Sequence, residues 1–418
     1  MTPTKPIEAT SIDWRSPSLP LMVAALVAPF AAVLQSKAMT PIGLVALVAC
    51  ILLARLRQGA WAVPRGPVLW AGLVLGGWGA LSALWAIDPR RSLSEGLVLA
   101  GMILLAAAAA EAVRRDDPAQ RRRLGHAVLI GLGIGLATAL ADHVSGNAIR
   151  AGVRGLREVP PSLAFGLKPA ASVMALLLPL LAGAWLPARW RVLALLAGGA
   201  VLLALPGDTA KLAALAGLAV AALVAFRPCA ARPIAVLLAL AMVATPALLG
   251  PAISAARPQI ERIPPSAIHR LLIWDFALGR AAEKPLTGWG MESARIVPGG
   301  DARPSPEQLA RLGVTRPDLL AWFAEPHLRL LPLHPHNGPL QIRLELGWVG
   351  TGLAALALLL LGLAAGRGAV PAAAMGALAS GFVTFFASFG AWQNWWLCAA
   401  ALALVIAAGM PAVKTGQK

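Results

Sequence analysis

Two histidines stand beside an asparagine and a proline in the segment His334-Pro335-His336-Asn337-Gly338-Pro339. Asparagine is a preferred helix N-cap and proline fits the first helical turn, so the segment predicts a loop that enters a helix at Asn337. A neutral imidazole, with a pKa of about 6.5, can take a proton from a hydroxyl group, which makes His334 and His336 candidate general bases. The alternative is a polar loop whose histidines only cap or solvate the helix.

A second stretch offers a candidate phosphate ligand. Charged residues interleave with apolar ones from His269 to Arg280, and Lys284-Pro285 follows. This pattern predicts an amphipathic helix lying on a membrane surface. Arg270, near its start, presents a fork of donors that matches phosphate oxygens. An interfacial arginine that contacts lipid headgroups is the alternative.

Further cations stand near the ends of apolar runs. Lys211 begins such a run, where an ammonium group is costly unless it snorkels or has a partner, so it is either a functional candidate or a snorkelling residue. One short segment contains four cations, Arg150, Arg154, Arg157 and Lys168, against Asp142 and Glu158. This excess indicates an anionic ligand, or else an exposed loop that tolerates charge.

Several kinds of chemistry lack their motifs. His334 and His336 form a His-x-His pair, and the sequence contains no second pair of this kind. Cys50, Cys229 and Cys398 are isolated, so neither a metal site nor a disulfide framework is expected. The sequence contains no phosphate-binding Gly-x-x-x-x-Gly-Lys-Ser/Thr loop and no Gly-x-Ser-x-Gly elbow. No cofactor is expected, and an energy-requiring reaction must draw on an activated donor already in the membrane.

The elements that position these residues follow from composition. Apolar residues make up 58% of the 418 residues and charged residues 13%, which excludes a soluble globular enzyme. At about 20 residues per span, the apolar content predicts an all-α polytopic membrane protein with about twelve transmembrane helices. The runs expected to form them are 19–34, 39–54, 67–87, 93–112, 125–146, 168–187, 190–206, 211–226, 233–254, 339–364, 370–389 and 391–412.

Charge predicts the orientation. A net charge of +17 would suggest nucleic acid on a soluble chain, but in a membrane protein it reflects the collection of Lys and Arg in cytoplasmic loops, so no nucleic-acid partner is expected. With both termini in the cytoplasm, 17 basic residues, including Lys5, Lys414 and Lys418, fall on that side and eight fall in the short loops opposite. The sequence thus predicts a multi-pass protein with cytoplasmic termini.

One segment interrupts the apolar pattern. Residues 1–254 should form helices 1 to 9, residues 255–338 a large periplasmic loop between helices 9 and 10, and residues 339–418 helices 10 to 12, all as one structural unit. Residues 255–345 hold 11 basic and 9 acidic residues. A long polar loop on an otherwise loop-poor scaffold is where function is expected.

These residues resemble those of a known family. The run from His334 to Gly350, the helix from Arg270 to Trp274, and the turn Pro285-Leu286-x-Gly288-x-Gly290 resemble the bacterial O-antigen ligase and O-antigen polymerase superfamily. The segment 85–92 is also similar to the family's early periplasmic turn. The resemblance implies a metal-independent, inverting C-type glycosyltransferase of the inner membrane with a periplasmic active site. Its donor would be a glycan on undecaprenyl diphosphate and its acceptor a hydroxyl group.

The resemblance also implies roles for individual residues. His336 would be the catalytic histidine, and Arg270 would hold the donor diphosphate. Lys211 stands where the family commonly has an arginine, so it keeps the charge but loses the bidentate fork. The family's Pro-Asn pair is replaced at residues 159–162, which weakens the assignment of nearby arginines. The expected substrate-binding residues are Arg270, Lys211, His334, Asn337, Arg154 and Arg157.

The sequence leaves the subfamily open. In a ligase the acceptor is the lipid A core, as in lipopolysaccharide biosynthesis, and in a polymerase it is another lipid-linked repeat unit. A transporter of lipid-linked sugars is a third hypothesis, although that class favours charges near mid-membrane and a repeated architecture. A catalytically inactive scaffold of an envelope assembly is a fourth. Membrane lipids are expected partners in every case.

Overall fold

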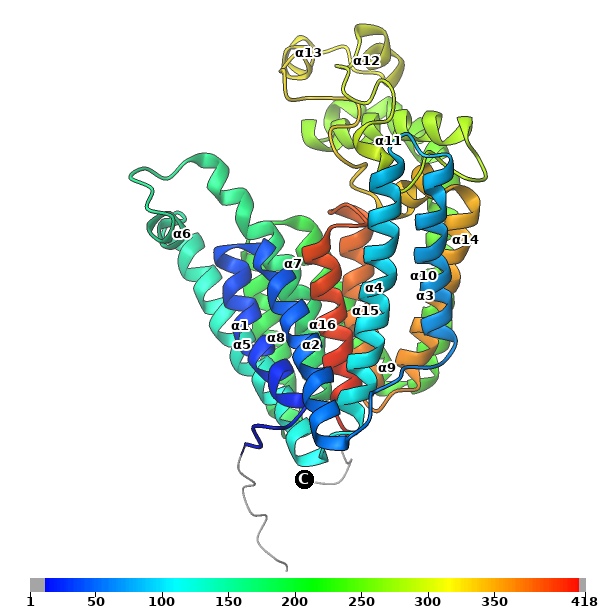
Figure 1. Cartoon of the computed structure of the whole chain (residues 1–418). Coiled ribbons are helices and arrows are strands. Elements are labelled where there is room, and N and C mark those ends of the chain that lie inside the picture. Colours follow the sequence, from blue (N-terminus) through cyan, green and yellow to red (C-terminus); the bar gives the residue numbers. More distant parts are fainter. Residues whose placement is uncertain (1–11, 413–418) are drawn as a thin grey trace, which may run out of the picture.

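The computed structural model describes residues 12–412, which form helices and connecting turns with no strand in that range (Figure 1). The first ten helices are α1 (Ser18–Leu34), α2 (Met39–Gln58), α3 (Pro67–Leu81), α4 (Pro89–Arg114), α5 (Pro118–Val144), α6 (Ala148–Val153), α7 (Leu167–Leu177), α8 (Ala188–Ala204), α9 (Asp208–Phe226) and α10 (Ala231–Ala256). The others are α11 (Pro265–Glu283), α12 (Pro306–Leu312), α13 (Pro317–Phe323), α14 (Gly338–Gly366), α15 (Pro371–Ala387) and α16 (Asn394–Gly409).

The predicted all-helical architecture is confirmed. Each of the twelve predicted apolar runs coincides with a helix, and the run 168–187 is α7 continued by a 3-10 helix over Leu178–Gly183. Between residues 12 and 412, eight helical segments are long and apolar enough to cross a membrane, and α1, α15 and α16 are shorter apolar helices of 16 or 17 residues. The count of twelve spans stays a prediction.

Small residues let the helices approach closely. On α5, Gly131 and Gly135 lie one turn apart and face α1, where a Cβ atom at Gly131 would stand 2.0 Å from the carbonyl oxygen of Ala25 and one at Gly135 would stand 2.4 Å from Pro29 Cβ. Without a hydrophobic driving force between helices in lipid, such close contacts are what hold membrane helices together. The Ala- and Gly-rich composition therefore serves packing.

At one end of the bundle, residues at the end of α4 and the start of α5 contact the start of α1 and the end of α16. The Asp116 carboxylate there accepts hydrogen bonds from Ser18 and pairs with Arg57 at 3.0 Å, and Arg121 donates to the Gly409 carbonyl at 2.7 Å. Arg57 and Arg121, both predicted to be cytoplasmic, lie at this end. Three of the predicted cytoplasmic residues, Lys5, Lys414 and Lys418, lie outside the described residues.

The opposite end carries the segment predicted as the large loop. Helix α11 runs across this end of the bundle, and α12 and α13 lie beyond it (Figure 1). The predicted helix is confirmed as α11, and its position on a membrane surface stays a prediction. Its residues Ile273, Ala277 and Ala281 are buried against α14, whereas Ile268 and Leu272 are buried in a separate small core with α12 and α13. The loop is thus a folded cap that places α11 over the ends of the helices.

Candidate active site

The histidine turn forms the helix start that the sequence predicts. Asn337 is the N-cap of α14, and its side-chain oxygen accepts from the N–H of Leu340 at 2.9 Å. His336 has a φ of 53°, a left-handed conformation that is uncommon for a residue with a side chain. Its backbone N–H donates to Nδ1 of His334 at 3.2 Å, which holds the turn. The prediction of a capped helix at Asn337 is therefore confirmed.

The His336 ring has one nitrogen fixed and one free. Its Nδ1 lies 2.7 Å from the carbonyl oxygen of Ser388, at the end of α15. A carbonyl only accepts, so Nδ1 carries the proton and the lone pair is on Nε2. Burial lowers the pKa of His336, and the nearby charge of Arg270 lowers it further against the opposing effect of the Ser388 bond. A half-buried neutral imidazole with a free Nε2 is suited to act as a base.

His334 has a different environment. Its ring is 7% exposed and lies 4.3 Å, centroid to centroid, from that of His336. Burial lowers its pKa to about 3, with smaller contributions from the charges of His336, Arg295 and Arg270. Because its Nδ1 accepts from the backbone of His336, the neutral ring supports the turn. Its predicted role as a substrate ligand stays a prediction.

Arg270 reaches the same part of α15. Its Nη1 donates to the carbonyl oxygen of Ala387 at 3.0 Å, one residue before the carbonyl that His336 contacts. Burial lowers the pKa of Arg270, and none of the described carboxylates pairs with it. One turn further along α11, Trp274 donates to the Pro335 carbonyl at 2.8 Å. Helix α11 is thus tied to the histidine turn, and four guanidinium N–H groups of Arg270 lack an assigned partner.

The start of α9 adjoins this site. Thr209 contacts the Ala387 carbonyl at 3.4 Å, so α9 and α11 meet at one acceptor. Two residues later, the Lys211 ammonium lies 3.5 Å from Asp208, with one third of its side chain exposed. Lys168 of α7 packs beside Gly207, just before α9. The structure therefore places the Lys211 segment next to the end of α15, without a direct contact from Lys211 to His336 or Arg270.

The two remaining predicted arginines lie elsewhere. Arg154 follows α6 and donates to the Leu34 carbonyl at 3.3 Å, and Arg157 is exposed in the next turn. Helix α6 lies toward the same end of the bundle as α11, but beside α5, across the bundle from α11 (Figure 1). Arg150 is fully buried and pairs with Asp142 at 2.6 Å. The structure does not bring this group to His336, and Arg150 has a structural partner.

A loop is inserted into a break in α14, close to the histidine turn. Gly347 has φ 66° and ψ −165°, which interrupts the helix. In an unbroken helix the N–H of Trp348 would bond to the carbonyl of Leu344. Here Trp348 N–H donates to the Pro285 carbonyl at 3.0 Å, and the Leu344 carbonyl accepts from Trp289 at 3.0 Å. The next residue along α14 shows the same exchange. The N–H of Val349 donates to the Leu286 carbonyl at 3.3 Å, and the Glu345 carbonyl accepts from the N–H of Gly290 at 2.8 Å.

This arrangement explains the Pro285-Leu286-x-Gly288-x-Gly290 turn, which we call the inserted loop (residues 285–290). Gly288 and Gly290 have φ of 69° and 100°, and a Cβ at Gly288 would stand 2.4 Å from the Glu345 carbonyl. Only glycine combines these backbone angles with so close an approach. The inserted loop follows α11 directly, so it fixes the end of α11 against α14.

Glu345 of α14 is a buried acidic residue close to the histidine turn that the sequence did not single out. It is fully buried, and its carboxyl oxygens accept from the N–H groups of Glu292 and Ala294, from Gln341 and from the indole of Trp392, at 2.6 to 3.2 Å. Gln341 in turn accepts from the backbone of residue 391 at 2.8 Å. A carboxylate within an apolar helix is itself a signal of function. This network joins the cap to the turn between α15 and α16.

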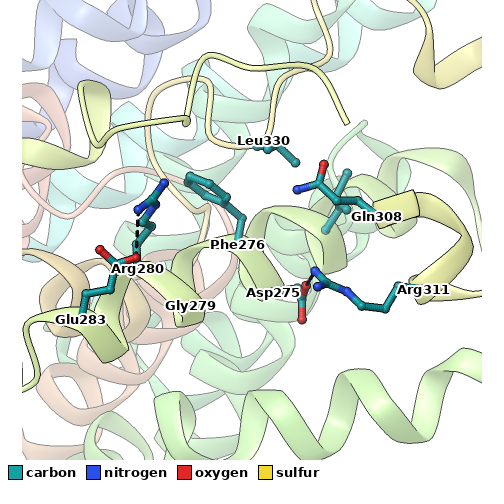
Figure 2. A pocket seen from close by; sticks show the side chains of 9 residues that line it. Asp275, Phe276, Gly279, Arg280, Glu283, Gln308, Arg311 and Leu330 are labelled. Atoms are coloured by element: carbon teal, nitrogen blue, oxygen red, sulfur yellow. Dashed lines mark hydrogen bonds and ion pairs between the residues drawn. The ribbon is translucent and has the colours of Figure 1, made fainter. Parts of the chain in front are cut away.

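A cavity of about 320 Å³ lies on the face of α11 opposite to Arg270, toward α12. Figure 2 shows Phe276 pointing toward Leu330 and two charged pairs beside it. Arg280 pairs with Glu283 at 2.8 Å, and Arg311 of α12 pairs with Asp275 at 2.9 Å. The arginines that line this cavity therefore have carboxylate partners, whereas Arg270 has none among the described residues. Within residues 12–412, no group of three or more His, Cys, Asp or Glu side chains is arranged to hold a metal ion.

Comparisons with known proteins agree with the resemblance seen in the sequence. The chain is 38% identical over 86 residues, 21% of its length, to a "Putative polysaccharide ligase" of Rickettsia conorii. It is 32% identical over 146 residues, 34% of its length, to a protein of the same name from Rickettsia bellii. The matched segments span 17% and 32% of those relatives. No family model and no solved structure matches the chain. The relatives support the resemblance to the O-antigen ligase and polymerase superfamily.

Proposed function

We propose that this protein is a glycosyltransferase of the inner membrane that moves a glycan from undecaprenyl diphosphate to a hydroxyl group of the lipid A core. The apolar helices provide a membrane-embedded scaffold, and the similarity to proteins named polysaccharide ligases supports a polysaccharide substrate. The observation that carries the proposal is the convergence of Arg270 and His336 on consecutive carbonyl oxygens, those of Ala387 and Ser388.

In this reaction Arg270 binds the donor. A diphosphate leaving group gains negative charge as the bond from the anomeric carbon to its phosphate oxygen breaks. Preorganised cations offset that charge, and a guanidinium offers paired donors to phosphate oxygens. Because Arg270 has no carboxylate partner among residues 12–412, its charge is available to the diphosphate. Lys211, at the start of α9, adds a point charge on the adjoining side.

His336 acts on the acceptor. Its Nε2 lone pair takes the proton of the acceptor hydroxyl as that oxygen bonds to the anomeric carbon, on the face opposite to the departing diphosphate. Undecaprenyl diphosphate leaves with the bonding electron pair, and the anomeric configuration is inverted. The Ser388 carbonyl keeps Nδ1 protonated and the ring oriented through the 2.7 Å contact. A positioned general base of this kind contributes about 100-fold to 10,000-fold in rate.

The test uses purified enzyme with lipid-linked donor and core acceptor. We expect His336→Ala to lower the transfer rate by about 100-fold or more. Arg270→Ala should lower it by about 10-fold to 100-fold through loss of charge-assisted contacts. His327→Ala and Arg303→Ala are matched controls, because both residues are exposed in the same cap. Transfer near the wild-type rate in both site variants, or equal losses in the controls, would rule out the proposed site.

The acceptor distinguishes a ligase from a polymerase. The same two residues serve either reaction, so assays with lipid A core and with a lipid-linked repeat unit are run side by side. We expect product only with the core acceptor, and extension of the lipid-linked repeat unit alone would make the protein a polymerase. Movement of lipid-linked glycan across liposomes without any acceptor product would instead indicate a transporter.

The proposed orientation places the α11 end of the bundle in the periplasm. Of the three cysteines, Cys229 is exposed at the opposite end, and Cys50 and Cys398 are buried. A membrane-impermeant maleimide should therefore leave the wild-type protein unlabelled in intact spheroplasts and label it at Cys229 after lysis. An Arg303→Cys variant should be labelled before lysis. Labelling of Cys229 in intact spheroplasts would reverse the proposed topology.

A further inference from the structure

A second cavity opens at the end of the bundle opposite to the candidate active site. Its volume is about 310 Å³, and it lies between the start of α10 and the end of α14. Arg232 of α10 and Arg367, which follows α14, both line it, together with Leu363 and the segment around Cys229. The volume lies at the lower end of the range of about 300–1,000 Å³ that is typical of small-molecule sites.

The two arginines of this cavity lack acidic partners. Neither Arg232 nor Arg367 makes an ion pair or a side-chain hydrogen bond within the described part of the chain. In contrast, Arg57, Arg114 and Arg115 at the same end pair with Asp116 or Glu111. Two uncompensated guanidinium groups beside one cavity attract an anion, and the guanidinium fork matches phosphate oxygens.

The surfaces that lead away from the two arginines are apolar. On α10, the exposed side chains Val236, Leu240 and Val243 follow Arg232 at 4, 8 and 11 residues. These spacings put them on one face of the helix, and 11 residues span about 16 Å. That length is close to half of the roughly 30 Å hydrocarbon core of a bilayer.

Helix α14 repeats the pattern in the reverse chain direction. Leu363, Leu360 and Leu356 precede Arg367 at 4, 7 and 11 residues, with Leu356 exposed and the other two half-buried. The antiparallel helices pack closely at this end, where a Cβ at Gly366 would stand 2.7 Å from Ala231 Cβ. The site therefore combines two cations at the adjoining ends of α10 and α14 with two apolar helix faces, each about half as long as a bilayer core is thick.

We propose that this cavity is a binding site for an anionic phospholipid. Its phosphate lies between Arg232 and Arg367, and its two acyl chains lie along the apolar faces of α10 and α14. A zwitterionic lipid offers the same apolar chains but no net charge, so the site discriminates through the two guanidinium groups. This site is separate from His336 and Arg270, so a negative result for lipid binding would leave the proposed transferase reaction untouched.

The test measures lipid retention by native mass spectrometry of the full-length protein in detergent. Phosphatidylglycerol and phosphatidylcholine of equal chain length are the probes. The wild-type protein should retain phosphatidylglycerol preferentially, and Arg232→Gln with Arg367→Gln should weaken this retention by about 30-fold, since each arginine near an anionic lipid contributes about a factor of five. The control, Arg65→Gln with Arg227→Gln, removes two exposed charges that do not line the cavity.

The melting temperature provides an independent readout in the same variants. Added phosphatidylglycerol should raise it for the wild-type and control proteins and leave that of the cavity double variant unchanged, because a ligand stabilises only the state it binds. Equal retention or equal stabilisation in the two double variants would overturn the proposal. Stabilisation by inorganic phosphate equal to that by the lipid would also overturn it, because the site would then recognise free phosphate.

Discussion

Gly347→Ala is the substitution that probes most directly how the cap is held on the bundle. Gly347 interrupts α14 with φ 66° and ψ −165°, a region of backbone conformation that is essentially restricted to glycine. A Cβ at this position would stand 2.1 Å from the carbonyl oxygen of Leu286 and 2.5 Å from the N–H nitrogen of Thr287. Alanine held in this backbone conformation therefore also displaces the inserted loop.

Two contributions set the magnitude. Holding alanine in this conformation costs about 1–3 kcal/mol. Displacement of the inserted loop breaks the hydrogen bonds from Trp348 to Pro285 and from Val349 to Leu286, each with a net contribution of about 1 kcal/mol. The free energy of unfolding should therefore fall by about 3–5 kcal/mol. The inserted loop follows α11 and fixes its end against α14, so we expect its displacement to shift α11 together with Arg270. Transfer should then fall at temperatures where the variant remains folded.

Gly352→Ala is the matched control in the same helix. A Cβ at Gly352 would meet no atom within 4 Å, so its effect should be no more than about 1 kcal/mol. Thermal and denaturant unfolding of both variants in detergent, with transfer assays at a permissive temperature, compare the two glycines. Equal stability and equal transfer in the two variants would refute the role assigned to the inserted loop.

Three further predictions concern buried polar groups. Glu345→Gln should lower the free energy of unfolding by about 2–6 kcal/mol, because the new amide nitrogen faces two of the four donors, whereas the exposed Glu283→Gln should have little effect in the same unfolding assay. The pKa of His336 is lowered from its ordinary value of 6.5 by burial, so the acid limb of kcat/KM should lie below pH 6.5, and a limb at or above that value contradicts the assigned environment. Asp142→Asn leaves buried Arg150 without its counter-charge and should cost about 3–5 kcal/mol in thermal unfolding, an expectation that wild-type stability in the variant would exclude.

Local features of the chain were predictable from the sequence. The apolar runs became helices because backbone groups in an apolar environment must be satisfied within the segment itself. The helix start at Asn337 and the helix around Arg270 were predictable because N-capping and helical periodicity depend on neighbouring residues in the chain. At the cluster of Arg150, Arg154 and Arg157, the sequence did not indicate that Asp142 would be buried with Arg150 and would neutralise its charge.

The meeting of distant segments was decided only by the tertiary structure. Arg270 and His336 are joined through the carbonyl oxygens of Ala387 and Ser388, and every residue has such a carbonyl, so no residue type marks these acceptors in advance. The inserted loop likewise exchanges backbone hydrogen bonds with α14. The sequence by itself determined which segments are helical and which side chains can do chemistry. Packing between helices determined which of those side chains share a site, because backbone contacts between distant segments depend on the whole fold.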